Sequence, residues 1–237
     1  MIEAAKFQDY QVSSTLSGGR SSLPANVAAA RAAGLSSVCL TENVTGATTW
    51  VPEFVSAVRR IPRVDGLRVL MSVEVAIHDL SGRVELPKGL RGLDLIHLSV
   101  GRFPGPDGPL AAYEVVSRMQ DGVWTVADVV AMLFEAQLGA MTRLPGAVLA
   151  HPFSVLRSLG LSEADLPDAA IAALAACAAA SATTVLVSEE WRSPGPRVVA
   201  AMLGAGVRVV AGSGARDVAM VGRYRYVERT LGALASH

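Results

Sequence analysis

Apolar and polar positions along the chain follow two different periods. Short apolar runs rich in β-branched residues alternate with longer segments in which apolar residues recur every three or four positions. The short runs predict strands at 8–13, 37–40, 67–77, 93–100, 146–152, 183–188 and 207–211. The longer segments predict helices at 25–33, 51–61, 110–119, 126–141, 162–180, 196–203 and 227–235. Seven strands alternating with helices favour a parallel α/β barrel, whose functional groups lie at the carboxyl ends of the strands.

The connecting segments carry the residues that end regular structure. A loop rich in Ser and Gly at 14–22 follows the first strand, and a Gly/Pro-rich loop at 101–109 follows the fourth. Residues 78–86 predict a turn or a small hairpin. The chain has 237 residues, 51% of them hydrophobic, and shows neither a sequence repeat nor a low-complexity linker. We therefore expect a single domain over residues 1–237.

The charge balance limits the partners that we expect. Lys and Arg number 21, Asp and Glu number 21, and the formal net charge is zero. Such a chain has no strong overall field for nucleic acid or an anionic membrane surface, so we expect a small-molecule ligand held by a local cluster. No heptad pattern specifies self-association, and a homo-oligomer or a protein partner stays open.

The two cysteines and the N-terminus bear on the compartment. Cys39 and Cys177 lie far apart in apolar or Ala-rich runs, which is typical of buried thiols in a reducing compartment. The first residues show no signal-peptide pattern, and the longest apolar run is interrupted before it reaches the length of a membrane span. We expect a cytoplasmic protein.

Three residues at or near strand ends are candidates for catalysis. His151 follows an apolar strand and is either a hydrogen-bonded core imidazole or a general acid or base. Glu74 lies inside a β-branched run, so its carboxylate either is paired or points into the barrel, which favours a role in the site. Glu42 ends another strand and serves either as a structural acceptor or in catalysis.

Arginines follow several of the predicted strands. Arg20, Arg102 and Arg216 each lie in a strand-end loop. A single exposed arginine is usually solvated surface, but three at one mouth favour the binding of an anion by at least one of them. Arg216, which ends the segment 212–216 after the seventh strand, is the strongest candidate.

Neutral and acidic groups complete the predicted binding set. Gln11 and Ser13 are alternate residues of the first strand, so they are expected to face the same way, with Tyr10 between them facing the other side. Asn43 and Glu189 follow the second and sixth strands and are predicted to contact the substrate.

The strand ends resemble, in order, the motifs of the PHP family, named for polymerase and histidinol phosphatase. Residues 9–19 read Asp-Tyr-Gln-Val-Ser-Ser-Thr-Leu-Ser-Gly-Gly and are similar to the family's opening Asp-x-His-x-His-Thr-x-x-Ser-Asp-Gly. Further likenesses fall at 34–43, 72–74, 94–101, 149–152 and 212–216. The resemblance spans nearly the whole chain and implies a distorted TIM-like (β/α)7 barrel of the PHP type.

The chain departs from the family's pattern at the metal ligands. Metal-dependent members would use nine His, Asp and Glu side chains at these motifs. Seven of the matching positions hold Gln11, Ser13, Gly18, Asn43, Gly101, Gly214 and Arg216. Glu74 and His151 remain, and two ligands do not build the usual site with three protein ligands. The resemblance therefore implies a barrel without a metal site, and we expect no cofactor.

Two classes of function follow. The first is a metal-independent enzyme that acts on a small polar, anionic metabolite by acid/base chemistry, as a lyase, isomerase, cyclase or hydrolase. The alternative is a catalytically inactive PHP relative that serves as a ligand-binding or protein-interaction scaffold. An enzyme with one residual metal ion at Glu74 and His151 is a third reading. The sequence names neither the substrate nor the reaction.

Overall fold

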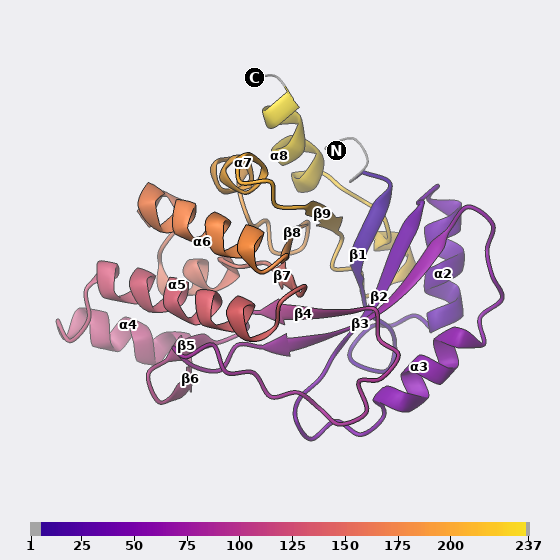
Figure 1. Cartoon of the computed structure of the whole chain (residues 1–237), viewed down its shortest axis with the longest axis horizontal. Coiled ribbons are helices and arrows are strands. Elements are labelled where there is room, and N and C mark those ends of the chain that lie inside the picture. Colours follow the sequence, from indigo (N-terminus) through magenta and orange to yellow (C-terminus); the bar gives the residue numbers. More distant parts are fainter. Residues whose placement is uncertain (1–5, 236–237) are drawn as a thin grey trace.

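Seven parallel strands form the centre of the molecule. The computed structural model describes residues 6–235. The strands are β1 Gln8–Val12, β2 Ser37–Asn43, β3 Arg68–Ala76, β4 Leu95–Ser99, β7 Val148–Ala150, β8 Thr184–Ser188 and β9 Val209–Gly212. They are hydrogen-bonded in the order β1-β2-β3-β4-β7-β8-β9 (Figure 1). A parallel bridge between Val12 and Ala215, just beyond β9, brings the two edges together. The nearly closed parallel barrel confirms the predicted fold class.

Helices flank this sheet. They are α2 Leu23–Ala32, α3 Val51–Arg59, α4 Ala112–Gln120, α5 Val126–Arg143, α6 Asp168–Ala180, α7 Pro196–Gly204 and α8 Tyr226–Ala235. In Figure 1, α2 and α3 lie on one side of the strands, and α4, α5 and α6 lie on the other. Three short 3₁₀ helices follow strands or precede α6: η1 Ser154–Leu159, η2 Glu163–Asp165 and η3 Val218–Met220.

Two predicted segments differ from the structure. The single helix expected at 162–180 is divided into η2 and α6, because Pro167 has extended backbone angles at the start of α6 and interrupts the helical hydrogen bonds. The loop expected at 101–109 contains a two-stranded antiparallel hairpin, with β5 Phe103–Gly105 and β6 Gly108–Leu110.

An apolar layer fills the barrel interior. Each of the seven strands contributes one side chain to it: Tyr10, Cys39, Leu70, Leu95, Val148, Leu186 and Val210. Larger apolar clusters lie between the strands and the helices. Because the apolar layer closes the middle of the barrel, polar side chains that point inward beyond it are confined to the mouth at the carboxyl ends of the strands.

Strand β1 contains an irregularity that decides which of its residues face inward. Its pairing with β2 shifts between Asp9 and Val12, so β1 holds one residue more than its partner over this stretch. Tyr10 and Gln11 therefore both point into the barrel, Tyr10 in the apolar layer and Gln11 toward Glu74. The expectation that Tyr10 faces outward is wrong, because a bulge breaks the alternation on which it rested.

The carboxylate of Asp9 fastens the segment that follows β9. One oxygen accepts a hydrogen bond from the amide of Ser213, and the other accepts one from the amide of Gly222, both at 2.9 Å. The side chain is fully buried, and burial raises the pKa of Asp9 to about 6, against the opposing effect of these hydrogen bonds. Asp9 thus anchors the edge where the barrel closes.

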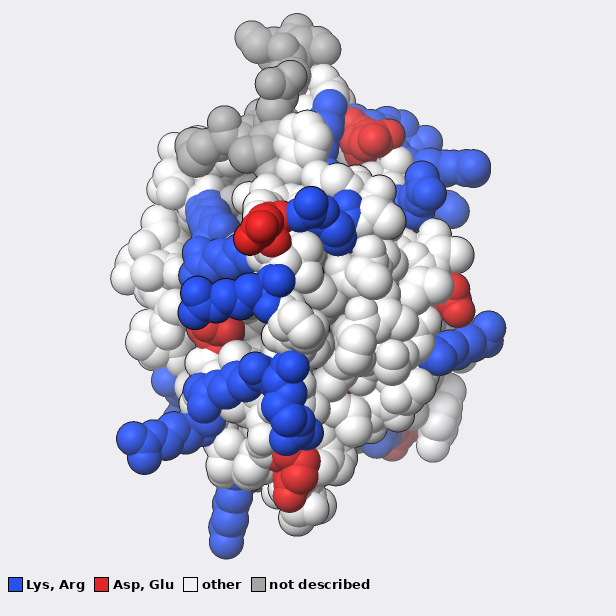
Figure 2. All heavy atoms as spheres, turned by 90° about the vertical axis from the view of Figure 1, so that its right-hand side faces the viewer, with Lys and Arg blue, Asp and Glu red and all other residues white. Residues whose placement is uncertain are grey.

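The zero net charge conceals an uneven distribution. Figure 2 shows many Lys and Arg side chains on the face that carries α2 and α3. Arg31 and Arg59 lie in the last turns of α2 and α3, where a cation complements the partial negative charge of a helix end.

In the described part of the chain, no helix is long and apolar enough to cross a membrane. Both cysteines are free; Cys39 is buried and Cys177 is half-buried.

Candidate active site

Glu74 and His151 meet at the mouth of the barrel. Glu74 Oε1 lies 3.2 Å from His151 Nε2, and the two side chains are 10% and 3% exposed. Gln11 Nε2 donates a hydrogen bond to the other oxygen, Glu74 Oε2, at 2.7 Å. Burial opposes ionisation of Glu74, but the charge and hydrogen bond of His151, with smaller effects from His97 and Gln11, lower its pKa to about 2. Two candidates from distant segments therefore form one hydrogen-bonded pair.

The imidazole of His151 is held on its other sides as well. Its Nδ1 lies 3.1 Å from Ser154 Oγ, and its ring centroid lies 5.0 Å from that of Trp191, at an angle of 31°. The backbone of His151 has φ 35°, a left-handed conformation that is unfavourable for a residue with a side chain. Ser154 and Trp191 were not among the predicted site residues.

His97 lies deeper in the barrel, opposite Glu74 in the register of β3 and β4. Its Nδ1 is 2.5 Å from Ser72 Oγ, and the side chain is fully buried. Burial lowers the pKa of His97 to about 4, although the charge of Glu74 acts in the opposite direction. His97 is therefore a neutral, buried imidazole on the strand next to that of Glu74.

An ion pair lies beside the Glu74–His151 pair. Arg216 Nη2 is 3.2 Å from Glu190 Oε1, with 55% and 30% of the two side chains exposed. Burial raises the pKa of Glu190, whereas the charge of Arg216 lowers it. Arg216 is thus already paired with a carboxylate of the chain itself. Sequence reasoning missed Glu190, although it continues the alternation of the inward-facing Leu186 of β8.

Glu189 lies apart from this cluster. Its Oε2 accepts hydrogen bonds from three backbone amides at the start of α8, those of Arg225, Tyr226 and Val227, at 2.7 to 3.0 Å. A carboxylate at a helix N-terminus satisfies amides that have no partner within the helix. Its neighbour Glu190 lies beside the Glu74–His151 pair, and the role of Glu189 in binding stays a prediction.

Glu42 holds the loop that follows β1. The side chain is buried; Oε1 accepts a hydrogen bond from the Ser14 amide at 2.9 Å, and Oε2 accepts one from Ser17 Oγ. Burial raises the pKa of Glu42 against the effect of these hydrogen bonds. Of the two interpretations of Glu42, these contacts favour the structural acceptor.

The remaining predicted residues do not converge on the pair. Ser13 Oγ donates to the carbonyl of residue 41 at 3.1 Å, and Asn43 is exposed at the end of β2. Arg20 is exposed, and its backbone amide bonds to the carbonyl of residue 216. Arg102 points toward α4, where its Nη2 lies 3.9 Å from Glu114 Oε2. Their roles in binding stay predictions.

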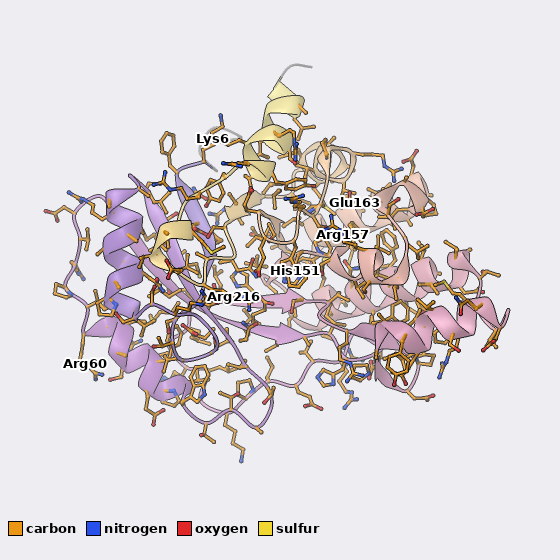
Figure 3. All side chains as sticks on the ribbon, turned by 180° about the vertical axis from the view of Figure 1, so that it is seen from behind. Lys6, Arg60, His151, Arg157, Glu163 and Arg216 are labelled. Carbon is orange, nitrogen blue, oxygen red and sulfur yellow. The ribbon has the colours of Figure 1, made fainter. Side chains whose placement is uncertain are left out.

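A cleft of about 700 Å³ opens beside His151, and its lining includes Ser154, Arg157, Glu163, Trp191 and Arg192. Both oxygens of Glu163 accept hydrogen bonds from the loop at 193–195. Within residues 6–235, neither Arg157 nor Arg192 has a carboxylate within 4.0 Å. In the view of Figure 3, His151 lies between Arg157 and Arg216. The cleft is therefore lined by two arginines that have no carboxylate within salt-bridge distance in residues 6–235, together with the carboxylates of Glu163 and Glu190.

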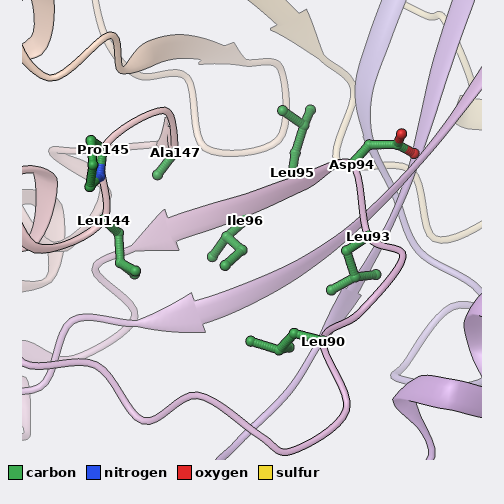
Figure 4. Close-up of a pocket in the computed structure, with 8 residues that line it drawn as sticks. All are labelled: Leu90, Leu93, Asp94, Leu95, Ile96, Leu144, Pro145 and Ala147. Atoms are coloured by element: carbon green, nitrogen blue, oxygen red, sulfur yellow. The ribbon is translucent and has the colours of Figure 1, made fainter.

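A second cavity lies at the opposite end of the strands. It has a volume of about 240 Å³ and is lined by Leu90, Leu93, Asp94, Leu95, Ile96, Leu144, Pro145 and Ala147 (Figure 4). Its one carboxylate, that of Asp94, accepts a hydrogen bond from the Met71 amide at 2.8 Å. The lining is otherwise apolar and lies where β4 and β7 begin, away from the polar mouth.

The donor set at the mouth does not fit a divalent metal ion. In the part of the chain that the structure describes, no three His, Cys, Asp or Glu side chains form a group able to hold one. Both oxygens of Glu74 face nitrogen atoms of Gln11 and His151, and the nearby guanidinium of Arg216 is a cation. A zinc site normally has at least three protein ligands.

The chain forms a nearly closed parallel barrel of seven strands with its polar groups at one mouth. No family model matches the chain, and no curated protein matches it. Solved structures do match. Histidinol phosphate phosphatase from Lactococcus lactis, complexed with zinc, L-histidinol and phosphate, has a TM-score of 0.68 and 14% identity over 96% of this chain and 93% of that one.

A structure from Listeria monocytogenes described as that of a histidinol phosphatase has a TM-score of 0.66 and 11% identity. It covers 91% of this chain and 97% of that one. Likeness at this level of identity is evidence about the fold. The chain therefore has the barrel fold of the histidinol phosphatases, which confirms the PHP-type fold expected from the strand-end motifs.

Proposed function

We propose that the chain is a metal-independent enzyme of PHP fold that acts on a small polar, anionic molecule by acid/base chemistry. The observation that carries the proposal is the buried pair of Glu74 and His151, which adjoins an open cleft through the contacts of His151 with Ser154 and Trp191. The buried carboxylate of Glu74 and the left-handed backbone of His151 each lower the stability of the folded chain. Features that lower stability in this way concentrate at functional sites.

The metal-free character rests on the chemistry of the donors. The Lactococcus neighbour is complexed with zinc. In this chain, Gln11 contributes an amide N–H to Glu74, and Arg216 contributes a positive charge close by. Hydrogen-bond donors and a guanidinium suit a carboxylate or an organic anion better than a metal cation.

The pair has a defined direction for proton transfer. An ionised Glu74 accepts the Nε2 proton of His151, and the neutral imidazole then has its lone pair on Nδ1. Nδ1 faces Ser154, which lines the cleft. His151 is therefore the proposed base, and Glu74 orients it and stabilises its protonated form.

The anionic part of the ligand has two arginines available that form no ion pair with the described residues 6–235. Arg157 and Arg192 line the cleft, whereas Arg216 is paired with Glu190. Guanidinium groups bind carboxylates and phosphates through charge-assisted hydrogen bonds. We therefore keep the expected anion site but assign it to Arg157 and Arg192.

The test compares His151→Ala and Glu74→Gln with the unmodified chain in a screen of small carboxylates and phosphate esters. Both variants should lose at least about 100-fold in turnover of a converted compound, the usual contribution of a general base. His78→Ala is the matched control, because His78 lies outside the cluster beside Glu85. Unchanged turnover in both folded variants would overturn the proposal.

One observation favours the scaffold as a second candidate. Both oxygens of Glu74 and both nitrogens of His151 already have partners within the chain, as in a purely structural network. A scaffold would bind its partner equally well in the Glu74→Gln variant and would show no His151-dependent turnover. Affinity purification that recovers no partner would count against it.

A further inference from the structure

Ser154 occupies a position that the proposed acid/base pair leaves unexplained. It is the first residue of η1, separated from the end of β7 by residues 151–153, and it is half-buried where it lines the cleft. Its Oγ lies 3.1 Å from His151 Nδ1 and donates a hydrogen bond to the carbonyl oxygen of Val100 at 3.3 Å, so the hydroxyl has to turn its one proton from Val100 to Nδ1 before His151 can accept it. The hydroxyl therefore stands between the proposed base and the space available to a ligand.

Ser154, His151 and Glu74 form a row of three groups in contact. The hydroxyl faces one nitrogen of the imidazole, and the carboxylate faces the other at 3.2 Å. A hydroxyl, a base within hydrogen-bond reach and a carboxylate that orients the base are the parts of a serine hydrolase site. The arrangement differs from the usual one in that the serine faces Nδ1 and the carboxylate faces Nε2.

We propose that Ser154 is a nucleophile, activated by His151 and Glu74, that cleaves carboxylic esters bound in the cleft. This inference rests on the proposed function, since it gives the pair of Glu74 and His151 a particular reaction. The unpaired guanidinium groups of Arg157 and Arg192 line the same cleft, so an ester that also carries an anionic group is the substrate class that fits.

The reaction is balanced within the three groups. Ser154 Oγ forms a bond to the carbonyl carbon, and its proton moves to His151 Nδ1 while the Nε2 proton stays shared with Glu74. The C–O bond of the leaving alcohol breaks, and the alcohol takes the proton from Nδ1. Water then attacks the acyl group, gives a proton to Nδ1, and the bond to Oγ breaks as Ser154 regains that proton.

A structural role for the hydroxyl is the competing explanation, and the chain holds a matched control for it. Ser158 lies in the same short helix, and its Oγ donates to the carbonyl of Val155 at 2.7 Å without a histidine partner. If the Ser154 hydroxyl only caps a turn, the two serines should react alike with a serine-directed reagent.

The experiment treats the full chain with a fluorophosphonate probe and maps the adduct by peptide mass spectrometry. Ser154 should be the labelled residue. Labelling should vanish in Ser154→Ala, persist in Ser158→Ala, and slow by at least about 100-fold in His151→Ala. Hydrolysis of p-nitrophenyl acetate should likewise be lost in Ser154→Ala, persist in Ser158→Ala and slow in His151→Ala. Thermal unfolding of each variant establishes that it is folded.

Several results would overturn the inference: an adduct on another residue, no adduct on the folded chain, or a labelling rate that is independent of His151. Turnover of a metabolite that needs His151 but survives in Ser154→Ala would remove the nucleophile and leave the acid/base proposal intact. His151-dependent labelling of Ser154 without turnover of any anionic compound would support the nucleophile and count against the proposed substrate.

Discussion

Gly214 makes room for the side chain of Glu190. A Cβ atom on Gly214 would lie 2.6 Å from Glu190 Cβ and 2.6 Å from Glu190 Oε2, closer than such atoms approach each other. The backbone of Gly214 has φ +68°, a conformation that glycine adopts without strain. The ion pair between Glu190 and Arg216 therefore depends on the missing side chain at Gly214.

Gly214→Ala should displace Glu190 and strain the backbone. We expect a loss of about 1–3 kcal/mol in the free energy of unfolding, from the left-handed conformation and the overlap together. Gly204→Ala is the control, because Gly204 ends α7 with open space around it and no positive φ. Urea unfolding of both variants measures the difference. Equal stability of the two would contradict the packing described.

Asp9 should give the stability of the chain a recognisable pH dependence. Its pKa is raised from 3.8 to about 6 on folding, so the folded chain holds the proton more tightly than the unfolded chain. The free energy of unfolding therefore falls by about 3 kcal/mol from this residue as the pH rises from about 4 to about 6. Asp9→Asn should remove this decrease in the free energy of unfolding with rising pH. Parallel stability curves for the two proteins over this range would show the assignment to be wrong.

Glu42→Gln should make the loop after β1 more mobile without abolishing the turnover of substrate. The substitution leaves one oxygen acceptor for the two groups of Ser14 and Ser17, and we expect a cost of about 1–3 kcal/mol. Hydrogen exchange at residues 14–19 should accelerate, whereas Glu53→Gln on α3 should leave it unchanged. Loss of turnover with unaltered exchange would instead support the catalytic interpretation of Glu42.

Purified protein should contain well below one zinc, manganese or iron ion per chain. The reason is the donor set: the oxygens of Glu74 face Gln11 and His151, and within residues 6–235 no three His, Cys, Asp or Glu side chains are grouped so that they could hold an ion. Elemental analysis before and after treatment with a chelator provides the measurement. A stoichiometric ion whose removal abolishes activity would refute the metal-independent proposal.

The sequence could predict which residues lie near one another at the strand ends, because the topology of a parallel barrel decides where these ends meet. In a parallel barrel the carboxyl ends of all strands meet at one mouth, so Glu74 and His151 were expected near each other despite 77 positions of separation. The structure brings their side chains into contact. That part of the candidate site required only the alternation of strands and helices.

The other contacts of the site depend on the conformations of loops. The sequence of a loop has no hydrophobic period from which its conformation could be predicted. Arg216 is predicted to bind an anion, and in the structure it pairs with Glu190 because the loops after β8 and β9 approach each other at Gly214. Ser154 reaches His151 through the turn that starts η1. Such contacts depend on the course of two or more loops at once, so the residue pattern did not indicate them.

The bulge in β1 affects how chains of this fold are aligned with one another. Tyr10 and Gln11 face the interior in succession, so a count of alternate positions from Asp9 gives the wrong orientation for one of them. Deleting one residue here would turn Gln11 out of the mouth and leave Glu74 without its amide partner. An alignment of this strand therefore has to allow for the bulge before any residue beyond it is compared with a metal ligand of another protein.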